Sequence, residues 1–558
     1  MNESIASEER APGFLAPLQV PLFRRIWVAS VLSNLGYMFL SVGTGWEMTS
    51  LTADAGMVAL VLTAMMLPMT LLSIPAGAIA DMYDRRRIGL CSLALSMASA
   101  AALTVFTSLG LASPWLLLGF CTLTGAGMTL FNPAWQASVS EQVPRRVLGQ
   151  AVALNSISFN IARSFGPALG GLVVAVAGAS ASFAATVICY VPLFTVMLFW
   201  RRPRVPSRLP PERIDRAVSA GIRYVLHSPP IRIVLVRTFC FGFGGSCLSA
   251  LMPLVTRDLL HGGAQVFGVM LGAYGLGAVV GAIGLNRLRQ TCTAEQVIAL
   301  STITLAGSIV VVATSTSAVL TAASLLVAGA GWMVALALCN VHVQSSAPRW
   351  VSGRLLAAYQ TSVAGGVALG SWGWGRVVEA LSVEYGLLLA ALYLAVSLLL
   401  GRLLPLPSIS NASLDPVKLS EPEVNLDLTG RSGPIVVQIE YDVPAEQARD
   451  FYRVMQALRS VRQRNGAYDW SIARDIGDAE LWIERFQCPT WHDYLRQRDR
   501  NTPHEVEIQR SSRCYLKAGS DVRVRRLLER PFGSVRWTDD APEDPLYTNG
   551  LNVASREP

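Results

Sequence analysis

Apolar residues dominate the first four hundred positions of the chain, in runs separated by short breaks that contain charged residues, glycine or proline. The runs are about twenty residues long, enough for a helix to cross a hydrocarbon layer roughly 30 Å thick. The pattern predicts an all-α membrane region with twelve transmembrane helices. We expect them at residues 26–49, 57–80, 88–110, 115–138, 148–177, 181–200, 231–254, 266–286, 296–315, 319–343, 354–376 and 385–405.

The pattern changes after the twelfth span, where a polar linker at 407–432 leads into segments typical of a soluble domain. IVVQIEYDV, YDWSIARDI and AELWIERFQ alternate as strands, and residues 445–463 have the periodicity of an amphipathic helix. Another helix begins at Thr490. The order strand, helix, strand, strand, helix favours a small ferredoxin-like α+β domain. We place it at 433–530, followed by an irregular tail at 531–558.

The membrane region contains an internal repeat with a fixed offset of 204 residues. The hexapeptide PRRVLG at 144–149 recurs as PRWVSG at 348–353. Glycines recur in the same register, Gly77 as Gly281, Gly166 as Gly370 and Gly171 as Gly375. Six crossings return the chain to its starting side, so the two six-helix bundles have parallel topology about an axis along the membrane normal. We expect the halves at 1–200 and 231–406, joined by a basic connector at 201–230.

Charge is distributed unevenly along the chain. Residues 1–406 hold 25 basic and 14 acidic side chains, whereas residues 407–558 hold 21 basic and 24 acidic ones. Of the 25, 21 lie on the side of the N-terminus, and only Arg257 and Arg376 lie in breaks on the other side. The positive-inside rule therefore predicts a multi-pass protein of the cytoplasmic membrane with both termini and the α+β domain in the cytosol. No soluble domain carries the basic cluster that a nucleic-acid partner requires.

Cysteine spacing gives no sign of a metal site or a cofactor. None of the nine cysteines forms a CxxC pair or a His/Cys ligand pattern. Unpaired cysteines usually serve as small apolar side chains. We expect no metal, no cofactor, no catalytic residues and no enzymatic activity.

The break after the second span carries the sequence GAIADMYDRRR. Together with the six-plus-six arrangement, this sequence resembles the major facilitator superfamily over roughly residues 20 to 405. The family signature here is Gly-x-Leu-Ala-Asp-(Arg/Lys)-x-Gly-(Arg/Lys)-(Arg/Lys), and Met82 and Asp84 depart from it as in the exporter branch of enterobactin-type siderophore exporters and macrolide efflux proteins. The candidate gating motif comprises Gly77, Asp81, Asp84, Arg85, Arg86 and Arg87.

Asp81 falls at the C-terminal end of its helix, where the macrodipole disfavours an anion by about 0.3–1 kcal/mol unless a partner compensates. The resemblance implies that Asp81 meets the N-terminus of the eleventh helix near Gly353, with Arg85 and Arg86 joining. This latch would hold an outward-facing state. The alternative is an ordinary basic loop that follows the charge rule. The second half has Leu285 at the matching position, so we expect asymmetric gating.

The fifth span carries a candidate helix-seam motif, and its spacing Gly-Pro-x-x-Gly-Gly resembles the Gly-Pro-x-x-x-Gly-Gly sequences of the superfamily's antiporters. Proline removes a helix hydrogen bond and glycines admit another backbone, so we expect a bend at a helix contact. The alternative is that glycine is simply frequent in membrane helices. The motif residues are Gly166, Pro167, Gly170 and Gly171, and the expected partner glycines are Gly268, Gly272, Gly277 and Gly281 on the eighth span and Gly366 and Gly370 on the eleventh.

Polar side chains inside the spans are candidates for a substrate or coupling pathway, because polar groups at depth are costly. Asn34, Tyr37 and Asn160 fall near the middle of their spans, where a hydrogen bond to a neighbouring helix is the alternative role. Arg163 falls slightly beyond the middle, where an unpaired cation costs at least ~2.5–3.5 kcal/mol. Its candidate partner is Glu47, an acid near the outer interface and a candidate coupling residue.

Arg237 falls close to the cytosolic edge, where its side chain can either join the pathway or snorkel to the surface. No carboxylate falls clearly in the middle of a span. Proton coupling is therefore implied mainly by the family resemblance.

The C-terminal α+β pattern resembles the dimeric α+β barrel domains of the antibiotic-biosynthesis monooxygenase type. Trp470, Trp482, Trp491 and His492 either form a pocket or belong to the core, and aromatic residues at this spacing are more often core. The resemblance implies ligand binding or self-association rather than a reaction.

These features predict a secondary active exporter of small amphipathic molecules, of the drug or siderophore type, with the lipid bilayer, a small-molecule substrate and protons as its partners. Two alternatives stay open. One is a small-molecule importer, and the other is a membrane-anchored sensor or enzyme that acts through the α+β domain.

Overall fold

The computed structural model describes residues 15–200, 214–348, 351–406, 422, 424–426 and 428–529, without a few side chains, among them that of Asp81. Most of the predicted linker and all of the irregular tail at 531–558 lie outside the described residues. The chain divides into two compact units. We call the described residues up to 406 the helical unit and residues 428–529 the tail domain.

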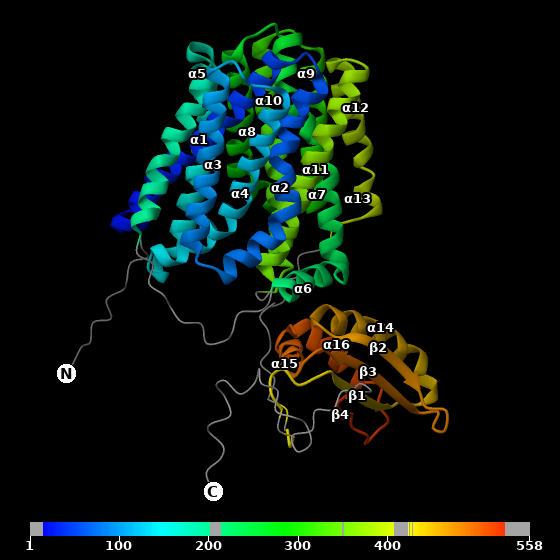
Figure 1. Ribbon diagram of the computed structural model, residues 1–558. Helices are drawn as coiled ribbons and strands as arrows, with labels where there is room; N and C mark the ends of the chain where they lie inside the picture. Colours follow the sequence, from blue (N-terminus) through cyan, green and yellow to red (C-terminus); the bar gives the residue numbers. More distant parts are fainter. Residues whose placement is uncertain are drawn as a thin grey trace, which may run out of the picture. The chain divides into compact units, whose positions relative to one another are not determined.

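The helical unit consists of α-helices packed side by side (Figure 1). Ten of the described helices are long and apolar enough to cross a membrane. The helices are α1 (Pro21–Leu51), α2 (Ala55–Met82), α3 (Arg85–Ser108), α4 (Pro114–Gln142), α5 (Leu148–Phe199), α6 (Ile214–Leu226), α7 (Pro229–Leu254), α8 (Ala264–Thr291), α9 (Ala294–Thr314), α10 (Ala318–Ser345), α11 (Ser352–Ala380), α12 (Val383–Ser397) and α13 (Leu400–Leu403).

Polar residues in the breaks explain where several helices begin. Asp54 accepts a hydrogen bond from the backbone N–H of Gly56 at 2.7 Å, and Asp84 accepts one from Arg86 at 3.0 Å. Thr293 opens α9 with a capping box. Such caps satisfy N–H groups in the first turn that have no partner within the helix. The polar breaks of the sequence therefore contain the starts of α2, α3 and α9.

Two of the predicted spans, 148–177 and 181–200, belong to the 52 residues of α5. The helix is interrupted at Gly178, where φ is 82° and ψ is 172°. Glycine adopts this left-handed region without strain. The backbone dihedrals stay helical at Pro167, so the bend expected at that residue stays a prediction. Proline is tolerated inside a membrane helix where neighbouring helices hold the backbone.

Helix bounds repeat at the offset found in the sequence. α4 and α10 begin 204 residues apart, and so do α5 and α11. The same offset carries Gly178, the break in α5, to Ser382, which caps the start of α12. The first half of the helical unit therefore comprises α1 to α5, and the second half comprises α7 to α13.

The connector expected at 201–230 contains a helix that the sequence analysis missed. α6 is amphipathic and contacts α2 of the first half and α7 and α11 of the second. Tyr224 is buried, whereas Ile222 and Leu226, one turn apart, are exposed. The connector is therefore not only a basic loop, because its second part is a helix that touches both halves.

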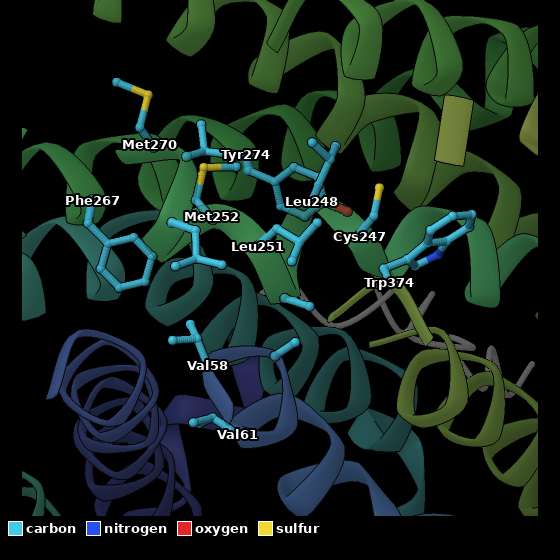
Figure 2. Close-up of a cluster of buried hydrophobic side chains, with 14 of the residues drawn as sticks. Val58, Val61, Cys247, Leu248, Leu251, Met252, Phe267, Met270, Tyr274 and Trp374 are labelled. Atoms are coloured by element: carbon cyan, nitrogen blue, oxygen red, sulfur yellow. The ribbon is translucent and has the colours of Figure 1, made fainter. Parts of the chain in front are cut away.

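A large buried apolar cluster joins the two halves. Figure 2 shows part of it, with Val58 and Val61 of α2 beside side chains of α7, α8 and α11, such as Leu251, Phe267 and Trp374. This cluster lies toward the end of the unit where α1 meets α2 and α7 meets α8, which we call the far end. The opposite end, where α2 meets α3 and α8 meets α9, is called the basic end because most arginines lie there.

The tail domain is a four-stranded antiparallel sheet with helices packed against it. Its strand order is β2-β3-β1-β4, and Val437 of β1 lies opposite both Phe486 of β3 and Arg526 of β4. Alternate residues of β1 share a buried cluster with Phe451 and Leu458 of α14. The sequence pattern did not predict α16 and β4. The elements are β1 (Ile435–Asp442), α14 (Ala448–Asn465), β2 (Tyr468–Arg474), β3 (Leu481–Cys488), α15 (Trp491–Asp499), α16 (Pro503–Arg513) and β4 (Arg523–Leu528).

Candidate functional site

The two halves of the helical unit meet along two helix pairs, of which α2 and α11 form the first. The Thr63 hydroxyl donates to the carbonyl of Ala368 across this pair at 2.9 Å. Nearer the far end, a Cβ placed on Gly375 would lie 2.6 Å from the Cβ of Ala59. Only a glycine at position 375 allows so close an approach, as is usual for contacts between membrane helices.

The second pair, α5 and α8, carries the predicted helix-seam motif. A Cβ placed on Gly268 would lie 2.6 Å from the carbonyl oxygen of Pro167 and 2.7 Å from the Cα of Gly171. One added on Gly275 would collide with the carbonyl oxygen of Arg163. Backbone meets backbone along this stretch, so a larger residue cannot be accommodated without moving a helix.

The glycines of the motif do not all serve the contact that the sequence predicted. Gly166 and Gly170 face α1, where their nearest neighbours are Met38 and Phe39. On the partner helix, Gly268 and Gly272 face α5. Gly277 and Gly281 instead face α10, and Gly366 and Gly370 face α7, so these glycines pack helices within the second half.

Side chains of α1, α7 and α8 complete the closure at the far end. Trp46 stacks on Phe267, with ring centroids 6.0 Å apart. Arg257 belongs to the short π-helix that follows α7, Val255–Leu259, and its guanidinium donates to the carbonyl of Thr49 at 3.3 Å. The halves are therefore joined at this end by apolar packing and by a hydrogen bond.

The basic end differs, because the close approaches between the halves stop before it. On α2 and α11 the approach nearest to the basic end joins Gly365 to Thr70. A Cβ placed on Gly77 or on Gly353 would meet no described atom within 4 Å. α4 and α10 also do not form one of the packed helix pairs. The described halves are thus closed at the far end and separate toward the basic end.

The candidate gating motif makes its described contacts within the first half. Besides the cap formed by Asp84, Arg85 forms an ion pair of 2.9 Å with Glu141 of α4. Arg86 donates to the carbonyl of Met197 at 2.9 Å, and Arg87 is exposed. The side chain of Asp81 lies outside the described part of the chain. Contact of this motif with α11 therefore stays a prediction.

The polar candidates of α1 pair with their own half. The Asn34 amide donates to the Ser158 hydroxyl of α5 at 3.1 Å, and Tyr37 packs against the large apolar cluster. Asn160 donates to the carbonyl of Ser156 in its own helix at 2.9 Å. The alternative role, a hydrogen bond between neighbouring helices, describes Asn34 in this structure.

The two arginines that the sequence placed inside spans have different surroundings. Arg237 is 8% exposed, and its guanidinium lies 2.5 Å from the carboxylate of Glu295, so it does not snorkel to the surface. Leu406 donates its backbone N–H to the same carboxylate at 2.5 Å, which fastens the chain after α13 to α7 and α9. A small cavity of about 40 Å³ adjoins this pair. Arg163, by contrast, has no hydrogen bond or ion pair among the described residues, and Glu47 does not reach it.

Glu295 is a functional group that the sequence analysis missed. Its signal was visible, because it is an acid in the first turn of α9, two residues after the cap residue Thr293. Acids are favoured at that position by the helix dipole. The sequence analysis treated Glu295 only as part of a polar break and therefore did not predict that it pairs with Arg237.

In the tail domain the three tryptophan candidates pack against the buried core, whereas His492 is exposed. Glu484 is fully buried and accepts hydrogen bonds from Tyr441 and Trp470, both at 2.9 Å, and from Arg462 at 3.2 Å. Burial and the Glu484 carboxylate raise the pKa of Tyr441 well above its ordinary value. This network links β1, β2, β3 and α14, while Arg462 Nη2 is buried without a described hydrogen-bond partner.

The other aromatic candidates are spread through the same domain. Trp482 packs edge-on against Phe451, and Trp491 packs against Tyr494. His492 donates its backbone N–H to the carbonyl of Gly430. No group of three or more His, Cys, Asp or Glu residues that could hold a metal ion occurs within the described ranges.

Comparison with known sequences gives one family. The family described as transmembrane secretion effector (MFS_3) matches residues 12–532. The staphyloferrin A transporter of Staphylococcus aureus is 27% identical over 47% of this chain and 66% of its own length, so the chain spans just under two thirds of that relative. The multidrug efflux pump Tap of Mycolicibacterium fortuitum is 24% identical over 61% of this chain and 84% of its own length. The enterobactin exporter EntS of Shigella flexneri is 24% identical over 63% and 83%.

Solved structures share the fold of the helical unit. The nucleoside transporter NupG aligns with a TM-score of 0.57 and 12% identity, over 69% of this chain and all of the other. A bacterial homologue of the human lysosomal transporter Spinster, in an inward-facing and unoccupied conformation, aligns with a TM-score of 0.56 and 12% identity, over 70% of this chain and 98% of the other.

Proposed function

Because the chain belongs to the transmembrane secretion effector family of the major facilitator superfamily, we propose that it is a secondary active exporter of small amphipathic molecules. The family and the named relatives are transporters, not enzymes. Two of the relatives named above are described as an exporter and an efflux pump, which favours export over import. Siderophores and drugs are the substrate types that these names support.

One observation carries the proposed mechanism, namely that the close glycine contacts between the described halves run from the far end to about the middle of the crossing. The Pro167–Gly268 and Arg163–Gly275 approaches form this contact, whereas a Cβ on Gly77 or Gly353 at the basic end would meet no described atom within 4 Å. We take the basic end as cytosolic by the charge rule. This packing supports an inward-facing state, in which a cavity between the halves would accept substrate from the cytosol. Rocking of the halves would release it outside.

We further propose twelve crossings with both termini in the cytosol. Ten helices meet the length and hydropathy expected of a span. Division of α5 at Gly178 and inclusion of α11 would bring the number to twelve. The repeat supports this count, because each helix segment of the first half has a partner 204 residues later.

The latch and the coupling ion remain parts of the proposal. In an outward-facing state we expect Asp81 to meet the start of α11, with Arg85 and Arg86 leaving their present partners. Protons are the proposed coupling ion on the strength of the family, with Glu47 as the candidate acid. We assign the tail domain to the ferredoxin-like type by its strand order and give it a ligand-binding or self-associating role.

Transport by inverted membrane vesicles tests the proposed function. Vesicles that contain the protein are incubated with labelled siderophores and drugs under an imposed pH gradient. Accumulation that depends on both the protein and the gradient is the expected result. Uptake of none of the compounds, with the protein present in folded form, would contradict export. A chain ending at residue 406 separates the helical unit from the tail domain, and we expect it to retain transport.

A further inference from the structure

Arg163 lies midway along the membrane crossing of α5. It is fifteen residues from Leu148, where the helix begins, and fifteen from the break at Gly178. At about 1.5 Å per residue, roughly 22 Å of helix separates it from either end. A cation at this depth costs at least ~2.5–3.5 kcal/mol on insertion scales unless an anion or water compensates it.

No described acid of the helical unit supplies that compensation. Arg163 makes no ion pair or hydrogen bond, and its described electrostatic neighbour is Tyr274 of α8. Glu47 is the acid nearest to the middle of a described span, yet it lies only four residues from the far end of α1. The other described carboxylates of the unit lie at helix ends or in breaks: Asp54, Asp84, Glu141, Asp258, Glu295, Glu379 and Glu384.

The position of Arg163 around the helix separates it from the lipid-facing side. Phe165, Leu169, Leu172 and Val176 are 46–80% exposed and form one stripe at helical spacing. Two residues correspond to about 200° of rotation on an α-helix, so Arg163 lies on the side opposite Phe165. Its partial exposure therefore does not come from that apolar stripe.

A stripe that contains the polar residues Ser156 and Asn160, beside the exposed Phe159, instead leads toward Arg163 from the side of the basic end. Ser156, Asn160 and Arg163 follow the spacing i, i+4, i+7, which places them on one side of the helix. All three are at least partly exposed. Pro167 is the next residue of that stripe, and its carbonyl touches α8 at the position of Gly268. Arg163 thus lies where this stripe reaches the close contact between α5 and α8.

We propose that Arg163 binds an anionic oxygen group of the transported molecule, so that the substrates are carboxylates or comparable oxyanions rather than neutral or cationic compounds. A guanidinium presents a planar set of donors that matches a carboxylate through two parallel hydrogen bonds. The substrate anion then provides the compensation that the described acids of the helical unit do not supply. The assignment of a substrate class rests on the proposed exporter function, whereas the binding of an anion at Arg163 does not.

Binding of matched fluorescent probes tests this proposal on the full-length protein in phosphatidylcholine nanodiscs. The probes are dansylglycine, which is anionic, dansylglycine amide, which is neutral, and dansylcadaverine, which is cationic. The wild type should bind the anionic probe at least about tenfold more tightly than the neutral one, the contribution of one charge-assisted hydrogen bond. Arg163→Gln should lose this preference, and Arg163→Lys should keep part of it.

Phe165→Gln is the matched control, because it places the same side chain on the lipid-facing side of the same helix and should bind as the wild type does. A wild type that binds the anionic probe no better than the neutral one, or an unchanged preference in monodisperse Arg163→Gln, would overturn the proposal. Vesicle transport of the same probes distinguishes the two claims. Arg163-dependent binding without transport would refute export alone, whereas gradient-driven transport of the neutral probe that Arg163→Gln leaves unchanged would refute anion recognition alone.

Discussion

The far end and the basic end of the helical unit are built from the same repeated helices but differ in how the halves meet. At the far end, glycines bring α5 and α8 together backbone to backbone, and Trp46 stacks on Phe267. At the basic end, a Cβ on Gly77 or Gly353 would meet no described atom within 4 Å, and α6 touches helices of both halves. Close packing at one end and separation at the other is the geometry that alternating access requires of a single state.

The comparison also separates two kinds of polar residue. Those at the basic end have partners inside one half, as Arg85 has Glu141 and Arg237 has Glu295. Between the halves, Arg257 pairs with Asp258 of its own half and also donates to a carbonyl of the opposite half, and Arg163 has no described hydrogen-bond or ion-pair partner. Pairs within one half can persist when the halves move, whereas the Arg257 contact across the seam must break.

The largest effect is expected from Gly268→Leu, which inserts a side chain between two backbones at the far end. Overpacking of this kind typically costs 1–3 kcal/mol, so the closed far end should open and transport should fall by at least about tenfold. The measurement is vesicle transport, normalised to folded protein. Gly284→Leu is the matched control on the same helix, because a Cβ at that position meets no described atom within 4 Å. Equal transport by both variants would show that close packing of α5 against α8 is not needed for transport.

A smaller effect is expected from Arg257→Gln, which weakens the hydrogen bond to the Thr49 carbonyl. A hydrogen bond from a charged donor contributes about 1.5–3 kcal/mol, so the balance between states should shift toward an open far end. Accessibility of a cysteine placed at Ala53 to a membrane-impermeant thiol reagent reports the shift. Arg376→Gln is the control, since Arg376 pairs with Glu379 of its own helix at 2.6 Å. A faster reaction in the control than in Arg257→Gln would contradict this closure.

A still smaller effect is expected from Asp81→Asn at the basic end. Loss of an anion near a helix N-terminus removes about 0.3–1 kcal/mol from the outward-facing latch, which corresponds to a few-fold lower turnover. The amount of folded protein should not change. Asp54→Asn, at the other end of the same helix, should behave as wild type because asparagine caps a helix as well as aspartate does. Wild-type turnover in Asp81→Asn would exclude the latch.

The smallest effect on transport is expected from the tail domain. Glu484→Gln leaves Arg462 buried without its counter-charge and should lower the stability of the domain by about 3–5 kcal/mol. Hydrogen exchange of the β3 peptide should then rise strongly, while vesicle transport stays near the wild-type level. If transport instead falls together with the protection of β3 from hydrogen exchange, the tail domain takes part in transport.

Much of this architecture could be read from the sequence, because hydropathy and glycine spacing are local signals. The breaks, the repeat and the Pro167–Gly171 contact were predicted in this way. Glycine spacing indicates which face of a helix is packed but not which helix packs against it. Gly277 was therefore assigned to α5, although it faces α10. α6 was missed because its thirteen residues follow a basic, proline-rich stretch. Neither the pairing of Arg237 with Glu295 nor the isolation of Arg163 has any signature in a single sequence.

The distance between spin labels at the two ends of the helical unit tests the central claim most directly. Cysteines at Tyr83 and Gly353 label the basic end, and cysteines at Ala53 and Leu381 label the far end, in a protein without the native cysteines. Double electron–electron resonance is recorded in nanodiscs with and without a transported compound. The account predicts that the basic-end distance shortens in part of the molecules while the far-end distance lengthens in the same fraction. Distances at both ends that stay single and unchanged with every transported compound would contradict it.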